Sequence, residues 1–232
     1  MISTVRPMVE ADVDEVARVH LLAFPNFFLS FLGERFLREL YMGILNDISG
    51  IAFVLEVNEQ VCGFVAGTDN SAGLYMRLLK ERWWRFGWAC AGKALRCPRI
   101  VPRLLRAFSA PSDKQREPGC GLLMSLATRP DFQGKHCGRS LVDAFLVAAA
   151  QHGLHAVALT TDRDNNEHVN RFYQHLGFEL AETYVTAEGR SMNEYVFNFS
   201  DCPTRVDQQP AFHAWQLPKP VQKRVPTFLK TD

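Results

Sequence analysis

The sequence contains no run of apolar residues near the roughly 18 that a membrane-spanning helix needs. Residues 1–7 also lack the apolar segment of a secretory signal. Six cysteines occur among 232 residues, but none belongs to a CxxC pair or has the spacing of a zinc site. The net charge of +1 does not by itself indicate an anionic partner. We therefore expect a reduced, cytoplasmic protein without a bound metal.

What is present is enough apolar sequence for a core, since 47% of the residues are hydrophobic. Asp12, with Glu15 three positions later, has the pattern of a helix N-cap, and apolar residues follow at helical spacing up to Phe24. A second helix is expected from about Leu32 to Leu45. Residues 51–57 and 61–67 are apolar runs around a polar turn, which predicts a β-hairpin.

A strongly basic segment follows this hairpin. Residues 77–106 hold nine basic residues against one acidic residue, a net charge of +8, so the rest of the chain sums to about −7. Bulky apolar residues, including Trp83, Trp84 and Trp88, are interspersed among the cations. We interpret residues 70–119 as a basic helical insert. It could be a lid with solvated arginines, a site for an anionic acceptor or membrane surface, or a nucleic-acid contact.

Regular alternation of strands and helices resumes at Gly121. Extended patterns cover 122–128, 156–161, 178–185 and 192–199, and helical patterns cover 137–152 and 166–176. This order predicts an α/β (α+β) layer arrangement. The tail, residues 201–232, carries five prolines and is expected to be irregular. We thus expect one domain over residues 1–200, followed by this tail.

The loop between 122–128 and the helix that follows suits an anion. A helix N-terminus offers free N–H groups and a partial positive charge, and small residues before it let the backbone approach a diphosphate. Lys135, Arg139 and Ser140 add two charges and a hydroxyl. The loop alone is equally compatible with an ordinary strand-to-helix turn carrying surface cations.

The loop resembles the signature of the Gcn5-related N-acetyltransferases, Gln/Arg-x-x-Gly-x-Gly/Ala. Here the signature is present as Gln133-Gly134-Lys135-His136-Cys137-Gly138, after Pro130-Asp131-Phe132, with His136 at the position of the middle glycine. A second element of the family, Asn-x-x-Ala-x-x-x-Tyr-x-x-x-Gly-Phe, is similar to residues 166–178, with Val169 in place of alanine. Asn166 lies 28 positions after Gly138. Two motifs in this order are far more specific than either one.

The resemblance implies a fold and a cofactor. The fold is a mixed, mostly antiparallel sheet of about seven strands flanked by helices, with the basic insert between strands 3 and 4. The cofactor is acetyl-CoA, acting as co-substrate. Its pantetheine arm would pair with Leu126, Ala127 and Thr128, and its diphosphate would bind residues 133–140. Asn166, which is also placed as a helix N-cap, and Phe172 would contact the arm.

The resemblance also implies the chemistry. An acceptor amine attacks the thioester directly, a backbone N–H of residues 126–128 polarises the carbonyl, and Tyr173 protonates the leaving thiolate. A phenol has a pKa of about 10 and is therefore protonated at neutral pH. The alternative for Tyr173 is a core residue whose hydroxyl is satisfied. The base is open among four carboxylates: Glu56, Asp69, Asp162 and Glu182.

The sequence therefore predicts an N-acetyltransferase acting on a primary amine of a small-molecule or sugar-linked acceptor. Two alternatives are a non-catalytic acyl-CoA sensor and a peripheral membrane protein that uses residues 73–107. No nucleic-acid partner is expected, and a homodimer stays open. The cysteines Cys120 and Cys137 are expected to be small core or loop thiols, because no His/Asp pattern accompanies them.

Overall fold

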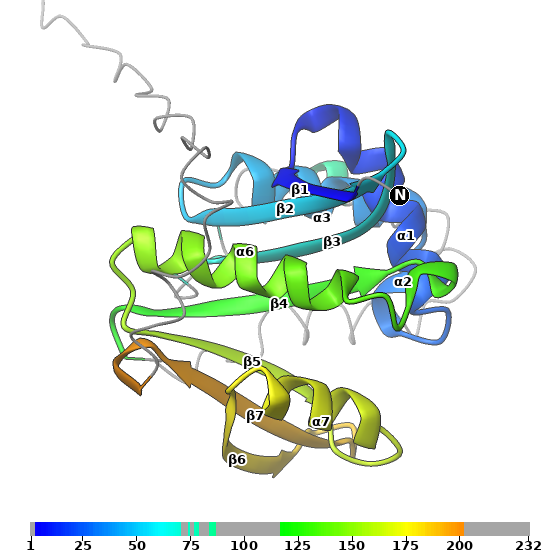
Figure 1. The fold of residues 1–232 in the computed structure, drawn as a ribbon. Coiled ribbons are helices and arrows are strands. Elements are labelled where there is room, and N and C mark those ends of the chain that lie inside the picture. Colours follow the sequence, from blue (N-terminus) through cyan, green and yellow to red (C-terminus); the bar gives the residue numbers. More distant parts are fainter. Residues whose placement is uncertain (1–2, 71–73, 75–76, 79–83, 87–116, 202–232) are drawn as a thin grey trace, which may run out of the picture.

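The computed structural model describes residues 3–70, 74, 77–78, 84–86 and 117–201. Seven strands form one sheet in the order β1-β2-β3-β4-β5-β7-β6 (Figure 1). Of the strand pairings, only β4 with β5 is parallel. The predicted mixed, mostly antiparallel sheet is therefore confirmed. The strand bounds are β1 Ser3–Pro7, β2 Gly50–Val57, β3 Gln60–Thr68, β4 Cys120–Thr128, β5 Ala156–Asp162, β6 Glu179–Val185 and β7 Ser191–Asn198.

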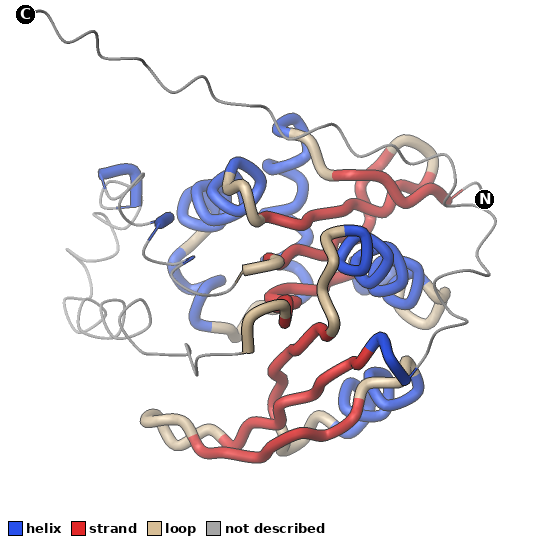
Figure 2. Tube along the Cα trace, turned by 90° about the vertical axis from the view of Figure 1, so that its left-hand side faces the viewer, coloured by secondary structure: helices blue, strands red, loops and turns tan. Residues whose placement is uncertain are grey.

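Helices cover both faces of this sheet, as Figure 2 shows when the sheet is viewed from its side. Among the elements with described bounds, one face carries α1 Val13–Ala23, α2 Phe28–Leu32 and α3 Glu34–Asn46. The other face carries α6 Cys137–Gln151 and α7 Glu167–His175. Single 3-10 turns lie at η1 Glu10–Asp12, η2 Pro130–Phe132 and η3 Phe199–Asp201.

Two core layers follow from the alternation of side chains along the strands. Phe53 and Leu55 of β2 face α6, whereas Val54 between them faces α3. We call the two layers the α6-side core and the α1–α3-side core. The predicted second helix is present as α3, and the apolar residues that lie at helical spacing in it are all buried: Phe36, Leu37, Leu40, Tyr41 and Ile44.

Two local predictions in the N-terminal region hold in position but not in detail: Asp12 is the N-cap residue of α1 but its side chain forms no cap, and the second helix starts two residues later than expected. The second helix begins at Glu34 rather than Leu32, because Gly33 has φ 94° and separates α3 from the short helix α2. Asp12 makes no side-chain cap for α1. Its carboxylate instead accepts hydrogen bonds from Arg6 Nη1 and Nη2, both at 2.7 Å, and from the backbone N of Val9 at 2.8 Å. The hydrogen bonds from Arg6 on β1 thus replace the side-chain cap that Asp12 was expected to give α1.

The described residues of the basic insert are anchored to the α1–α3 face. Leu74, Leu78 and Phe86 are buried in the α1–α3-side core. Arg77 forms an ion pair with Asp47, at 2.9 Å from Nε to Oδ2, and Arg85 pairs more loosely with Glu39 at 3.6 Å. These two arginines are therefore engaged with α3 and the segment that follows it. The described part of the insert thus packs on the α1–α3 face, but these two arginines are ion-paired rather than solvated and Trp84 is exposed, so the role of the insert stays a prediction.

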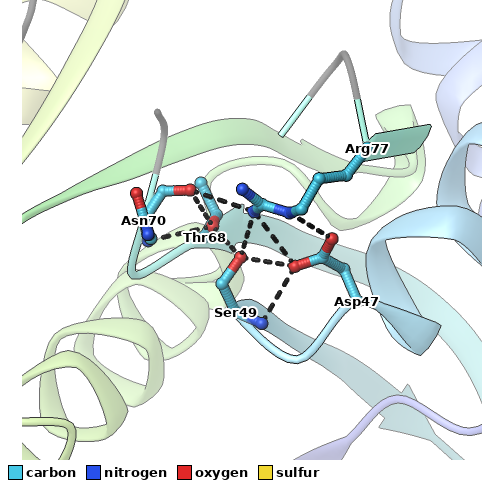
Figure 3. Close-up of polar contacts among 5 residues, drawn as sticks. All are labelled: Asp47, Ser49, Thr68, Asn70 and Arg77. Carbon is cyan, nitrogen blue, oxygen red and sulfur yellow. Dashed lines mark hydrogen bonds and ion pairs between the residues drawn. The ribbon is translucent and has the colours of Figure 1, made fainter. Parts of the chain in front are cut away.

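Figure 3 shows the hydrogen bonds and the ion pair around Arg77. Arg77 Nη2 donates to Ser49 Oγ at 2.9 Å and to the carbonyl oxygen of Asn70 at 3.3 Å. Ser49 Oγ lies 2.7 Å from the hydroxyl of the fully buried Thr68. Arg77 thus fixes the start of the insert to the ends of β3 and α3.

The remainder of the insert and residues 202–232 lie outside the described part of the chain. The irregular tail, the boundary at residue 200 and a membrane contact through 73–107 therefore stay predictions. Among the described residues, no helix is both long and apolar enough to span a bilayer. Within the same residues, no group of His, Cys, Asp and Glu could hold a metal ion.

Candidate active site

Strands β4 and β5 separate in the middle of the sheet. They pair only at Cys120 with Ala156, Gly121 with Val157 and Leu122 with Ala158. Beyond this point β4 pairs with β3 alone and β5 with β7 alone among the described residues. Figure 1 shows the two strands diverging toward their C-terminal ends. We call this opening the splay. It leaves one edge of β4 without a strand partner, although β4 is a central strand.

A β-bulge interrupts β4 beside the splay. Ala66 pairs with Ser125 and Gly67 with Leu123, so β4 has one extra residue, Met124, at this point. A bulge bends its strand and redirects the side chains that follow. As a result, Leu123 and Leu126 both face the α6-side core, whereas Ala127 faces the α1–α3-side core.

The loop from β4 to α6 has a backbone suited to an anion. Gly134 has φ 74° and His136 has φ 60°, two left-handed residues immediately before the first turn of α6. Such turns orient successive N–H groups toward one concave side. A β-carbon on Gly134 would meet no atom within 4 Å, so this glycine serves the backbone angle rather than close packing.

His136 occupies the position where the family signature has glycine, and its positive φ explains why glycine suits that position. Histidine is one of the few other residues found with some frequency in this conformation. The His136 side chain is exposed. Its carbonyl oxygen accepts from Ser140 N at 3.1 Å, which starts the hydrogen bonding of α6.

Cations surround this loop, but they differ in their partners. The Phe132 ring lies 4.9 Å from Lys135 Nζ and 5.6 Å from the Arg129 guanidinium carbon. Arg129 pairs with Asp131 at 3.1 Å, and Arg139 approaches Asp143 at 3.7 Å. Lys135 has no carboxylate partner among the described residues. Its charge is therefore the one in this loop most available to a phosphate.

Tyr173 lies on α7 and is 7% exposed. Its ring packs against Phe172, Phe178 and Tyr195 at centroid distances of 5.1, 5.7 and 6.4 Å. Burial raises the pKa of Tyr173, so the hydroxyl stays protonated at neutral pH.

The Tyr173 hydroxyl makes no hydrogen bond with the described part of the chain. The buried side-chain atoms that lack both a partner and solvent are instead His20 Nε2 and Ser30 Oγ. The structure therefore shows a protonated hydroxyl without a partner among the described residues. This does not match the alternative of a core tyrosine with a satisfied hydroxyl.

The two sequence motifs meet in space. A β-carbon on Gly138 would lie 3.3 Å from Phe172 Cζ, so the first turn of α6 touches α7. Leu126, Cys137, Phe172 and Tyr173 all contact the α6-side core. The structure thus brings these predicted residues together. Ala127 faces the opposite core, and Gln133, Lys135, Arg139 and Ser140 are exposed around the loop.

Asn166 is the N-cap residue of α7, but its side chain makes no cap hydrogen bond. Its Nδ2 instead donates to Thr161 Oγ1 at 2.8 Å and to the Asp162 carbonyl at 3.0 Å. The predicted side-chain cap is therefore wrong, because β5 competes for the amide. Oδ1 is the Asn166 atom left for a ligand.

A buried network that the sequence prediction missed holds α7 in place. Asn170 Oδ1 accepts from Asn193 Nδ2 and from Tyr195 Oη, each at 3.0 Å, while its Nδ2 donates to the Asp162 carbonyl at 3.0 Å. The network ties α7 to β7 and to the end of β5, one turn before Tyr173. Its signal in the sequence is a polar residue, four positions after Asn166, on the inward face of the helix.

The four carboxylates considered as bases occupy different places. Glu56 accepts a hydrogen bond from Arg6 on β1, and Asp69 pairs with His152 at 2.7 Å beyond the end of β3. Neither borders the splay, because β2 lies two strands from it and β3 ends beside the closed end of the splay. Asp162 lies at the open end of β5. Glu182 on β6 pairs with Glu194 of β7, a buried carboxylate that the sequence prediction did not single out.

The cysteines of the described residues carry no nucleophilic arrangement. Cys62 and Cys137 are buried and Cys120 is partly buried, and all three thiols are free. Burial raises the pKa of Cys137, which disfavours the thiolate that a nucleophile needs. The expected small core or loop thiols fit this placement.

The fold is similar to that of several solved acetyltransferases. The ribosomal-protein-S18-alanine N-acetyltransferase of Escherichia coli has 14% identity and a TM-score of 0.54, over 85% of this chain and 94% of that one. The polyamine N-acetyltransferase of Drosophila melanogaster has 17% identity and a TM-score of 0.56, over 85% of this chain and 100% of the other. PaiA of Thermoplasma acidophilum, solved with coenzyme A, has 14% identity and a TM-score of 0.51, over 84% and 98%.

No curated protein matches the sequence. The model of the acetyltransferase (GNAT) family, however, matches residues 16–178, well over half of the chain. The match spans the splay, the loop before α6 and the helix that carries Tyr173. This protein therefore belongs to the GNAT family of acetyl-CoA-dependent N-acetyltransferases.

Proposed function

We propose that this chain transfers the acetyl group of acetyl-CoA to a primary amine of a small-molecule or glycan-related acceptor. The observation that carries the proposal is the protonated hydroxyl of Tyr173, which has no partner among the described residues and lies on the same side of the sheet as Leu126 of the free-edged strand β4. A free edge can pair with the amides of a pantetheine arm, much as an added strand would. A donor beside it can then serve the leaving sulfur.

In this proposal the cofactor lies on the α6–α7 side. The pantetheine arm pairs with the backbone of Leu126, Ala127 and Thr128. The diphosphate sits against the N–H groups of residues 133–140, with Lys135 as the nearest available cation. Asn166 contributes Oδ1, and the Phe172 ring bounds the arm where it approaches Gly138.

The chemical step is a direct transfer. The nitrogen of the neutral amine forms a bond to the acetyl carbonyl carbon, and a backbone N–H of β4 stabilises the oxyanion. The carbon–sulfur bond then breaks, and Tyr173 supplies a proton to the thiolate. The amine loses its proton to a carboxylate or water. Of the four carboxylates considered, Asp162 is the one on a strand that borders the splay, whereas Glu182 on β6 and its neighbour Glu194 on β7 lie farther out in the sheet.

The solved relatives act on different acceptors, a ribosomal protein in one case and polyamines in another. The acceptor of this chain must therefore be tested directly. Acetyl-CoA is expected to raise the melting temperature of the full chain in a concentration-dependent way. Release of free coenzyme A thiol across a panel of primary amines is then expected for a subset of them. If acetyl-CoA stabilises the protein but none of the amines causes thiol release, the protein would be an acyl-CoA sensor instead of an enzyme.

A further inference from the structure

Arg190 spans the open end of the splay. It lies in the turn between β6 and β7, and its Nη2 contacts both carboxylate oxygens of Asp162 at 2.7 Å, with Nε at 3.1 Å from Oδ1. The guanidinium carbon also lies 5.5 Å from the centre of the Phe27 ring, in the segment between α1 and α2. Arg190 and Asp162 belong to the β5–β7 half of the sheet, whereas Phe27 belongs to the other half.

This bridge lies on the face opposite the proposed cofactor. Phe27 is next to α2, and helices α1–α3 cover the face that α6 and α7 do not. In Figure 2 the turn joining the two lowest strands lies on the side of the sheet that carries α1–α3. On the proposed function, an acceptor that enters from this face at the open end of the splay passes beside Arg190.

The contacts of Arg190 leave one edge of its guanidinium unused. Asp162 takes the Nε–Nη2 edge and Phe27 covers one flat face. Nη1 makes no hydrogen bond with the described residues, and the side chain is 43% exposed. The planar guanidinium is held on two sides, so its Nη1 donors are preorganised for an oxygen of a carboxylate or phosphate.

We infer that Arg190 selects an acceptor that carries an anionic group, a carboxylate or a phosphate, as well as its amine. This inference rests on the proposed function and names the acceptor class. Arg190 would anchor the anion at the open end, and the amine would extend toward the thioester. The exposed ring of Phe27, 43% accessible, offers apolar surface beside it. Asp162 orients the guanidinium and is a positioning residue.

The test compares amines that differ only in the anionic group. One pair is phenylalanine and phenethylamine, and another is phosphoethanolamine and ethanolamine, so the two pairs separate a carboxylate from a phosphate. Thiol release by the full chain should favour the anionic member of at least one pair by tenfold or more in kcat/KM. Arg190→Gln should raise the KM of that member at least tenfold, with kcat changed less than threefold, and leave its neutral partner within twofold.

Further variants separate recognition from structure. Arg190→Lys keeps the charge but loses the fork, and should recover only part of the preference. Asp162→Asn should weaken the same preference through misorientation, and melting temperatures report whether each variant folds. Equal or better turnover of the neutral amines, or an equal effect of Arg190→Gln on both members of a pair, overturns the inference while leaving the acetyltransferase function intact. If neither the anionic nor the neutral amines cause thiol release, the result counts against the proposed function itself.

Discussion

The α-carbon of Gly138 lies so close to Phe172 that a β-carbon there would stand 3.3 Å from the ring atom Cζ. This contact joins the first turn of α6 to α7 beside the proposed cofactor arm. Gly138→Ala should displace the ring by a few tenths of an ångström and weaken acetyl-CoA binding about threefold to tenfold. Titration calorimetry with acetyl-CoA would measure the loss of affinity. In the double variant Gly138→Ala, Phe172→Leu the two effects should not add, and additive effects would mean that the contact is not shared.

Tyr173→Phe should lower kcat for thiol release by about 10²-fold to 10⁴-fold, because the leaving thiolate loses its proton donor. Acetyl-CoA affinity and stability should change little, since the Tyr173 hydroxyl bonds to none of the described residues. Tyr195→Phe is the matched control. It removes a hydroxyl that donates to Asn170 and should cost about 1 kcal/mol of stability while keeping kcat. Unchanged kcat in Tyr173→Phe would remove Tyr173 as the acid.

Two glycines with nearly the same backbone angle separate strain from cofactor binding. Gly134 at φ 74° precedes α6 and Gly153 at φ 76° follows it, and a β-carbon on either would meet no atom within 4 Å. Alanine at each position should cost a similar stability, about 1 kcal/mol, seen in urea unfolding. Only Gly134→Ala should also weaken acetyl-CoA binding, because its loop presents the diphosphate site. Equal affinities for both variants would place the diphosphate elsewhere.

Buried His20 should make the protein less stable in mild acid. Its Nδ1 lies 2.6 Å from Tyr41 Oη, and burial lowers the pKa of His20 to about 4. The unfolded chain, with a pKa near 6.5, binds the proton more readily. The stabilising contribution is therefore complete above about pH 6.5 and lost as the pH falls toward 4, by at most about 1.4 kcal/mol per pH unit.

Urea unfolding between pH 8 and 4.5 measures this dependence. The double variant His20→Leu, Tyr41→Phe removes both partners, and its stability should fall less steeply with acidification than that of the unmodified protein. Parallel curves for the two proteins would mean that His20 is not held neutral by the fold.

Arg77 and Arg85 of the basic insert should contribute differently to the free energy of unfolding. Arg77 contacts Asp47, whose side chain is 6% exposed, whereas Arg85 pairs with Glu39 at 3.6 Å and is 46% exposed. Arg77→Gln should lower the free energy of unfolding by about 1–3 kcal/mol because Asp47 loses its charged partner. Arg85→Gln should cost less than about 1 kcal/mol. Similar losses in the two variants would contradict the anchoring role of Arg77.

The order of strands and helices from residue 121 onward could be predicted from the amino-acid sequence, because those signals are local. The apolar period of 3.6 or 2, the glycines before α6 and the polar turn at 58–60 each act over a few residues. The occurrence of the motif at 133–138 together with Asn166 and Tyr173 was also visible in the sequence, and this combination indicated the family.

Features that depend on contacts between separate elements could be seen only in the folded protein. The Asp12 side chain binds Arg6 rather than capping α1, and the Asn166 side chain donates to Thr161 of β5 rather than capping α7. The splay exists because β4 and β5 pair over three residues and no further, which no local pattern encodes. The bridge from Asp162 through Arg190 to Phe27 joins residues more than 130 positions apart. Contacts between elements compete with local preferences, and their outcome depends on how the whole sheet packs.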